Sequence, residues 1–394
     1  MKNTDCAKKP KSVLFVIIAT ALITAVACFS VFAIFVFTTP GLLELIKLDF
    51  LVDAYFYGEK LNDDVKDGLL SGYVDGLNDR YAQYLTLDES LDRKNRLNGV
   101  SSGLGITVTK DLDSQNIYVV KVYDDSPAKK VGLEKRDIIV CVDDVSVSEL
   151  GYTEAVSMIP REIGQTVRLK VLRDNAYIDF EVEYSNIELQ TVFFEKIGEY
   201  GYIEITSFNS ATVEQFYNAV NSLQSKGVKG LIFDVRDNGG GTVNSVGKML
   251  DLLLPEGDLM TVKYKFGNTK VMLKSDEKEI ELPMVVLVNS NTASASEVFA
   301  SNIREFKKGI LIGEKSFGKG IMQDTFKLFG DTDVVFTVAE LFTHNMKSYH
   351  GEGLIPDIEV KLSDKENSER FFIDISKDTL VSAAIDWLDG EINE

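Results

Sequence analysis

The sequence predicts a multidomain protein of mixed α+β and α/β class, in which a transmembrane helix precedes a small helical region, a β-rich domain and a core of βαβ units. Three observations predict this class. An uncharged apolar run lies near the N-terminus, short β-rich runs fill about 97–185, and strands alternate with helices from about 186 onward. With 394 residues, 45% of them hydrophobic, the chain is long enough for two or three domains with their own cores.

The apolar run from Val13 to Thr38 predicts a membrane anchor. It holds no charge over about 26 residues, roughly 39 Å as a helix, which is enough to span a bilayer. Lysines precede it, so the positive-inside rule keeps the N-terminus cytoplasmic and places everything after Pro40 outside. A cleaved signal peptide and a lipoprotein signal ending at Cys28 are the alternatives. The run continues about ten residues past Cys28, which favours an uncleaved, single-pass anchor in the cell membrane.

Changes of pattern divide the chain into five parts. Residues 1–40 form the cytoplasmic stub and anchor, and 41–96 show mainly helical periodicity. Residues 97–185 hold β-rich runs separated by Gly, Asp and Pro turns, with one helix among them. Residues 186–365 alternate strands with helices, which suits a largely parallel sheet, and 366–394 end in an amphipathic helical tail.

Composition excludes several classes of function. A net charge of −19 argues against a nucleic-acid partner, because binding phosphate backbones requires clustered Lys and Arg. The part beyond the anchor holds one cysteine, Cys141, and the chain has only two histidines, His344 and His350. These residues cannot complete an ordinary zinc ligand set, so we expect neither a metal site nor a cofactor.

The segment VNSNTASASEVFASNIREF, which begins at Val288, places hydroxyl groups between an apolar strand and a helix. Ser294 stands at the expected helix start, where unpaired N–H groups and the helix dipole favour an anion such as a tetrahedral oxyanion. Ser294 with Glu297 also matches a capping box, which needs no catalytic role. From this segment alone both readings stay open.

The segment GEKSFGKGIMQ contains a lysine between two glycines, Gly318 and Gly320. A lysine in an apolar site loses solvation of its charged form, so its pKa falls and Lys319 could act as a general base. Gln323, four residues on, could orient the amine. The alternative is a surface lysine in an ordinary turn. The frame of a phosphate-binding loop is absent.

Two glycine-rich turns are candidate backbone binding sites. Gly239 to Gly241 lie between a strand and a helix, where N–H groups could approach an oxyanion or a phosphate, or where the chain only turns tightly. SGLGITV, at Gly103 to Val108, leads into a strand whose edge could pair with a peptide while its amides hold a terminal carboxylate. The helix expected at about Thr153 to Ile159 would form the other wall of that groove.

Taken together, these stretches resemble the carboxy-terminal processing peptidases, tail-specific serine proteases with an embedded PDZ domain. Ser294 and Lys319 keep the family's spacing of 25 residues. The matching motifs, in the family's order, are LNDRYAQYLT at 77–86, GLGI at 103–106, RDNGGG at 236–241, SASE at 294–297, FGKGIMQ at 317–323 and GLIPD at 353–357.

The resemblance implies a serine-type endopeptidase that uses a Ser-Lys dyad. Ser294 would be the nucleophile, Lys319 the general base and Gln323 the residue that orients the lysine. The backbone N–H groups of Ala295 and Gly240 would form the oxyanion hole.

The resemblance also implies partners. Gly103, Leu104, Gly105 and Ile106 would bind a peptide, so we expect exported protein or peptide substrates with apolar C-termini. The helical region before the PDZ domain and the tail are candidate surfaces for a homodimer. The alternatives are a catalytically inactive PDZ scaffold that holds envelope partners and, behind it, a nucleotide-binding enzyme. Departures from the family pattern, such as Arg80 where Pro is usual, leave the dyad intact and bear on substrate fit or regulation.

Overall fold

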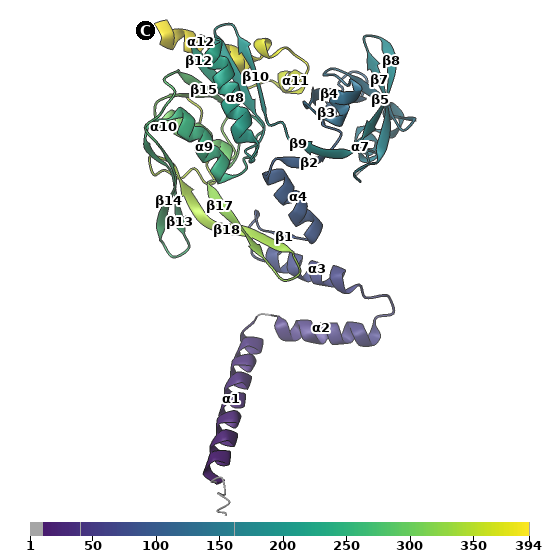
Figure 1. The fold of residues 1–394 in the computed structure, drawn as a ribbon, viewed down its shortest axis with the longest axis vertical. Helices are drawn as coiled ribbons and strands as arrows, with labels where there is room; N and C mark the ends of the chain where they lie inside the picture. The colour runs from purple at the N-terminus through teal and green to yellow at the C-terminus, as the bar shows by residue number, and fades with distance from the viewer. Residues whose placement is uncertain (1–10, 40, 161, 394) are drawn as a thin grey trace, which may run out of the picture. The chain divides into compact units, whose positions relative to one another are not determined.

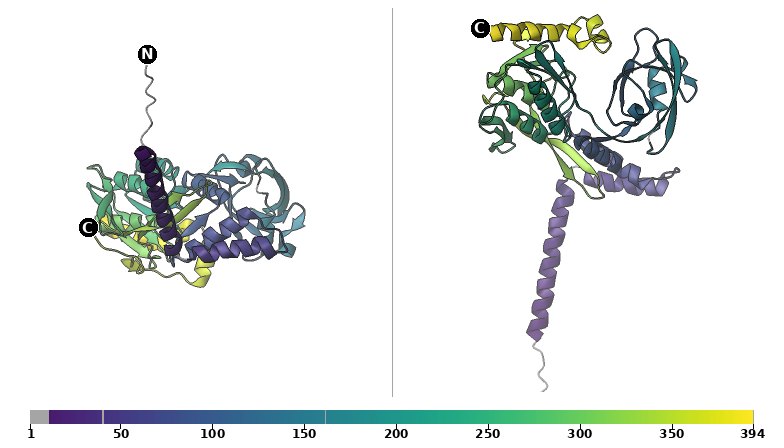
Figure 2. Two further views of the ribbon diagram at one scale, coloured as in Figure 1. Left: turned by 90° about the horizontal axis from the view of Figure 1, so that it is seen from below. Right: turned by 45° about the horizontal axis from the view of Figure 1, so that its top comes forward.

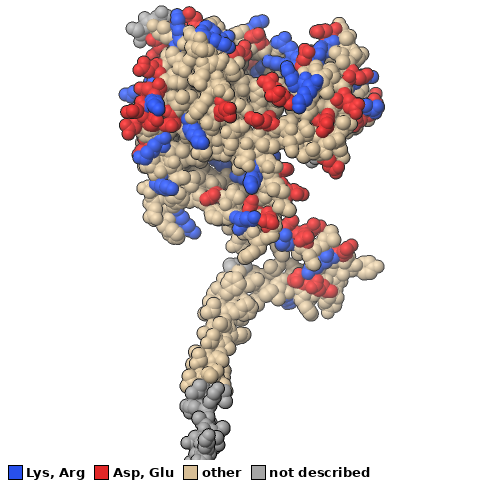
Figure 3. Space-filling model, viewed as in Figure 1, with Lys and Arg blue, Asp and Glu red and all other residues tan. Residues whose placement is uncertain are grey.

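The computed structural model describes residues 11–39, 41–160 and 162–393 (Figure 1). The chain divides into two compact units with a boundary between Tyr73 and Val74. The helices at the start of the chain are α1 (Lys11–Thr38), α2 (Leu42–Tyr55) and α3 (Asn62–Asp75). Within α1, residues Phe15–Thr38 have a mean hydropathy of 2.5, and this stretch shows no charged side chain in Figure 3. It is the one helix of the described residues that is long and apolar enough to cross a membrane.

The β-rich domain of the second unit is a sheet of alternating burial. In β7 the side chains of Val167, Leu169 and Val171 point into the domain core and their neighbours point to solvent, as a two-residue period requires. The sheet order is β3-β4-β5-β7-β8, with β6 paired to β5, so β3 lies at an edge. The elements are β3 (Ile106–Lys110), β4 (Ile117–Val122), α5 (Pro127–Val131), β5 (Ile138–Val142), β6 (Val145–Ser146), α6 (Val147–Leu150), α7 (Tyr152–Ser157), β7 (Thr166–Arg173) and β8 (Ala176–Glu183).

A second sheet of the same unit carries the βαβ pattern. Its order is β10-β11-β12-β15-β16-β19, and every neighbouring pair is parallel except β10 with β11. All residues of β12 and β15 are buried, because helices cover both faces. The strands are β10 (Val192–Ile197), β11 (Tyr200–Ile205), β12 (Gly230–Asp234), β15 (Met284–Val288), β16 (Gly309–Gly313) and β19 (Ile358–Glu359), and the helices are α8 (Thr212–Ser225), α9 (Val243–Leu253), α10 (Ala295–Glu305), α11 (Asp364–Glu369), η1 (Ile375–Lys377) and α12 (Thr379–Asn393).

Alternate residues of this sheet build two separate cores. Leu231 and Phe233 of β12 join the larger cluster with α8, α9 and α10, whereas Ile232 joins a smaller cluster with α12. Figure 2 shows α12, in yellow, lying across the core on the side away from α8 and α10. The amphipathic tail expected from the sequence is therefore a helix packed on the sheet.

A third sheet of the same unit pairs segments that are far apart in the sequence. It is ordered β1-β18-β13-β14, and β17 also pairs with β18. The sequence predicts helix for most of 41–96, but three residues there form β1, which pairs antiparallel with β18. A strand this short has no periodicity of its own, and the partner strand determines its structure. The remaining elements are β1 (Gln83–Leu85), α4 (Leu87–Leu97), β2 (Val100–Gly103), β9 (Ser185–Glu188), β13 (Gly257–Tyr264), β14 (Thr269–Ser275), β17 (Ile321–Lys327) and β18 (Asp333–Phe342).

Candidate active site

Ser294 lies in a strained turn between β15 and α10. Its φ of 58° and ψ of −117° are unfavourable for a residue with a side chain, and such strain costs on the order of 1–3 kcal/mol where the surrounding structure maintains it. Thr292 fixes the preceding turn, because its hydroxyl donates to the Val235 carbonyl at 2.9 Å. Helix α10 starts at Ala295, so the amide of Ala295 belongs to the first turn, which has no carbonyl within the helix to bond.

The Glu297 carboxylate does more than cap α10. It accepts a hydrogen bond from the Ser294 amide at 2.9 Å, as the capping-box pattern predicts. It also accepts from the Ser316 hydroxyl at 2.5 Å, the Gly318 amide at 2.7 Å and the Lys319 amide at 2.8 Å. Burial raises the pKa of Glu297 even though all four donors favour its charged form. One buried side chain therefore joins the serine segment to the lysine segment.

Lys319 is half-buried, and its Nζ donates to Oε1 of Gln323 at 2.7 Å. Burial lowers the pKa of Lys319, and the nearby Arg93 lowers it further. The backbone on both sides of Lys319 requires the flanking glycines. Gly318 has a φ of +87°, and a methyl group at Gly320 would lie 2.8 Å from the His350 nitrogen.

Tyr81 is a member of the site that sequence reasoning did not identify. Nε2 of Gln323 donates to the Tyr81 carbonyl, and Nζ of Lys319 lies 4.8 Å from the centre of the Tyr81 ring. Asp79 holds the turn before it by accepting from the amides of Tyr81 and Thr337, each at 3.0 Å. The motif LNDRYAQYLT was the available signal, but nothing in the sequence places it beside the lysine.

The glycine turn lies directly against the Ser294 segment. A methyl group at Gly240 would lie 2.9 Å from the Ala295 nitrogen and 2.9 Å from Cβ of Ser294. The two predicted oxyanion donors therefore come from adjacent backbone. The Gly240 amide, however, donates to Oδ1 of Asn238 at 2.8 Å. The sequence analysis predicted this amide as an oxyanion donor, and in this structure it already has an acceptor.

Asn238 is a second residue that sequence reasoning did not identify. Its backbone carbonyl accepts from the Ala293 amide at 3.0 Å and from the Ser296 hydroxyl at 2.8 Å. Its side-chain amide donates to the Ile205 carbonyl at 2.8 Å. This fully buried residue thus fixes the glycine turn to both sides of Ser294.

The predicted peptide-binding residues lie at the end of β2, in the turn that follows it and at the start of β3. Gly105 has a φ of +80°, and a methyl group there would lie 2.1 Å from Cβ of Ser126, so glycine is required. Leu104 is buried, and its carbonyl accepts from the Ala128 amide at 3.0 Å. Ile106 begins β3, whose outer edge has no strand partner within the described residues. Helix α7 flanks that strand through a 3.4 Å hydrogen bond from the Tyr152 hydroxyl to the Val108 carbonyl.

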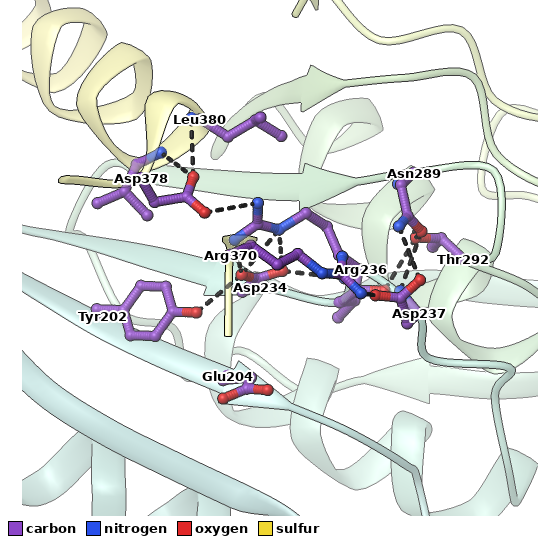
Figure 4. Close-up of polar contacts among 12 residues, drawn as sticks. Tyr202, Glu204, Asp234, Arg236, Asp237, Asn289, Thr292, Arg370, Asp378 and Leu380 are labelled. Carbon is purple, nitrogen blue, oxygen red and sulfur yellow. Dashed lines mark hydrogen bonds and ion pairs between the residues drawn. The ribbon is translucent and has the colours of Figure 1, made fainter. Parts of the chain in front are cut away.

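An ion-pair cluster lies at the end of β12 and the start of the turn that follows it (Figure 4). Arg236 contacts Asp234 at 2.5 Å and Asp378 at 3.0 Å, and all three side chains are at most 7% exposed. A cavity of about 610 Å³ adjoins this cluster between β4, β10 and the segment around Phe371, and neither Ser294 nor Lys319 lines it. Among the described residues, Ser294, Lys319 and the glycine turn form an arrangement suited to acyl transfer, and this cluster lies outside it.

A strained serine at a helix start, a desolvated lysine and an adjacent glycine turn are groups that a serine-type acyl transfer could use. The PDZ domain family model matches residues 102–184, and the peptidase family S41 model matches 199–360. The carboxy-terminal processing protease CtpA of Bacillus subtilis (strain 168) is 33% identical over 327 residues, which cover 81% of this chain and 70% of that protein. The chain therefore belongs to peptidase family S41, among its serine-type carboxy-terminal processing proteases, as its motifs predict.

The chain is also similar to a second relative and to a solved structure. A CtpA-like serine protease of Staphylococcus epidermidis (strain ATCC 12228 / FDA PCI 1200) is 28% identical over 309 residues, 77% of this chain and 62% of that protein. The chain thus spans less than two thirds of that relative. A solved S41 protease structure from Bacteroides fragilis NCTC 9343 is 18% identical with a TM-score of 0.58, covering 85% of this chain and 91% of that one, and this likeness concerns the fold alone.

Proposed function

We propose that the chain is a membrane-anchored endopeptidase that hydrolyses peptide bonds of exported proteins through a Ser294–Lys319 dyad. The observation that carries the proposal is the shared acceptor Glu297, which couples the backbone of the serine to that of the half-buried lysine. The lowered pKa of Lys319 supports a neutral amine that can accept a proton.

The mechanism follows from these groups. Neutral Nζ of Lys319 takes the proton of the Ser294 hydroxyl as its Oγ attacks the scissile carbonyl. The Ala295 amide donates to the resulting oxyanion, and the Gly240 amide joins it once it leaves Oδ1 of Asn238. The protonated lysine then gives its proton to the leaving amine. A water molecule, deprotonated by the same lysine, hydrolyses the acyl-enzyme. Gln323 accepts from Nζ and fixes its direction throughout.

Replacement of each dyad residue tests the chemistry. Purified Ser294→Ala and Lys319→Ala variants should each lose cleavage by at least about a thousandfold, as removal of a nucleophile or its base does in serine proteases. Both should keep the circular dichroism spectrum of the wild type, because neither side chain builds a hydrophobic core. Retained activity in either folded variant would contradict the dyad.

We also propose that the PDZ domain selects substrates by apolar C-terminal tails. The open edge of β3 and the Gly103–Ile106 turn support this proposal. Tail peptides with a free C-terminal carboxylate should bind the Ser294→Ala variant and lose affinity when that carboxylate is amidated. Equal binding of both forms would contradict it. Tail binding without any proteolysis by the wild type would favour the inactive PDZ scaffold instead.

The Phe15–Thr38 helix supports a single-pass anchor with the catalytic part outside the cytoplasm. The full chain should remain in the membrane fraction after alkaline carbonate extraction, whereas a chain lacking residues 1–40 should not. A protease added to intact cells from outside should reach the part after Pro40. Protection of that part would reverse the proposed orientation.

A further inference from the structure

Arg80 is exposed and forms a cationic platform over two aromatic rings, one of which also lies beside Lys319. Its guanidinium carbon lies 4.6 Å from the centre of the Tyr81 ring and 5.0 Å from the centre of the Phe317 ring. Phe317 is 45% exposed, and its amide donates to the Thr292 carbonyl at 3.0 Å, which ties it to the serine segment. The two rings therefore hold the guanidinium near both catalytic segments while leaving it open to solvent.

Charged groups of both signs lie near this platform. Arg93 and Arg80 both act on Lys319 in the sense of a nearby cation, lowering its pKa. Nε of Arg93 is buried and has no hydrogen-bond partner in the described part of the chain. One opposing carboxylate is that of Asp79, and it already accepts two backbone hydrogen bonds. Arg80 and Arg93 thus add two cations near Lys319, where the nearby carboxylates are those of Asp79 and the buried Glu297.

We propose that Arg80, seated on Tyr81 and Phe317, forms an anion subsite that takes the carboxylate of an acidic side chain close to the scissile bond. The proposal rests on the proposed endopeptidase function and adds a specificity to it. An arginine is suited to this task because its planar guanidinium can stack on aromatic rings and still pair with a carboxylate.

The test uses the full chain and a set of internally quenched, C-terminally amidated peptides. Amidation removes the terminal carboxylate, so that PDZ binding does not affect the comparison. Each peptide carries Glu or Gln at one of the four positions on either side of the cleaved bond. At one position the wild type should prefer Glu over Gln about fivefold or more in kcat/KM, and high salt should weaken the preference. In Arg80→Gln the ratio of the two rates should fall to about one.

A matched control is Arg168→Gln, which removes an arginine whose side chain is 64% exposed in the β-rich domain and should leave the ratio unchanged. Binding of the same peptide pairs to the Ser294→Ala variant measures the preference for Glu over Gln as a ratio of affinities, without cleavage. Equal rates and equal affinities for Glu and Gln at every position would overturn the subsite, as would a Glu preference that survives Arg80→Gln. Absence of all peptide cleavage by the wild type would instead contradict the proposed function, and the binding measurement would still decide on Arg80.

Discussion

The backbone amides of Ser294 and Lys319 donate to the same atom, Oε2 of Glu297, at 2.9 Å and 2.8 Å. Two segments that are 25 residues apart in sequence therefore share one acceptor. Oε1 of the same carboxylate accepts two more donors from the lysine segment. The relative position of Ser294 and Lys319, the proposed nucleophile and base, thus depends on a side chain that is bonded to their backbone amides.

Glu297→Gln is expected to disturb both stability and catalysis. All four partners of the Glu297 carboxylate are hydrogen-bond donors, and the NH₂ group of a glutamine cannot accept from them. The buried donors on that side would lose their partner, at a cost of about 1–3 kcal/mol. A displaced lysine segment should lower kcat about 10–100-fold with a smaller effect on KM. Urea unfolding and steady-state kinetics measure the two effects.

Glu199→Gln is the control for Glu297→Gln, because it removes a carboxylate from an exposed ion pair with Lys229. Its free energy of unfolding should stay within about 0.5 kcal/mol of the wild type. Wild-type kcat in Glu297→Gln would show that this carboxylate does not position the dyad.

The pH dependence of the rate should report Lys319. The base acts in its neutral form, whose fraction rises with pH, so a lowered pKa moves the ascending limb of kcat/KM below the range of an ordinary lysine. In Arg93→Gln a neighbouring cation is lost, the pKa of Lys319 rises, and the limb should move to higher pH. Lys94→Gln, an exposed change on the same helix, should leave it in place. A limb that does not move in Arg93→Gln would contradict the electrostatic role of Arg93.

Short motifs, read together as a family resemblance, were sufficient to single out the residues of the proposed dyad. A short motif contains each of Ser294, Lys319 and Gln323. The glycines around the lysine and at Gly240 mark places where the backbone conformation or the close neighbours exclude a side chain. The βαβ core could be predicted for a similar reason, because buried parallel strands such as β15 are continuous apolar runs.

Long-range partners could not be predicted. The Tyr81 carbonyl meets Gln323 across 242 residues, and no periodicity encodes such a contact. Glu297 was assigned to a capping box because a carboxylate three residues after a serine has that local role. Its bonds to residues after 315 become visible only in three dimensions.

Gln323 offers a test of proton transfer that leaves the serine untouched. Gln323→Glu would place a carboxylate beside Nζ of Lys319, and an opposite charge stabilises the protonated amine and raises its pKa. Activity at neutral pH should therefore fall by at least tenfold and recover as the pH rises. Gln323→Ala should lose activity without that recovery.

Asp324→Asn controls for Gln323→Glu, since Asp324 is the next, exposed residue on β17 and should leave the pH profile unchanged. Identical pH profiles for Gln323→Glu and the wild type would contradict a base at Lys319.

The buried cluster of Figure 4 should govern stability rather than chemistry. Burial by itself would raise the pKa of Asp234, but the Arg236 guanidinium outweighs it and holds the pKa below its ordinary value. Arg236→Met leaves Asp234 and Asp378 buried without their cation and should cost about 3–5 kcal/mol near pH 7.5.

The pH dependence of that loss separates charge from packing. In the wild type the contribution of Asp234 is present above the ordinary carboxyl pKa and is lost as the pH falls through its lowered folded pKa. Without Arg236 the carboxyl pKa is raised instead, so a falling pH neutralises the buried charge and should shrink the difference from the wild type. Thermal unfolding at pH 5 and pH 7.5 measures this, with the exposed Arg168→Met as the control that changes little at either pH. A loss independent of pH would mean that Arg236 contributes packing alone.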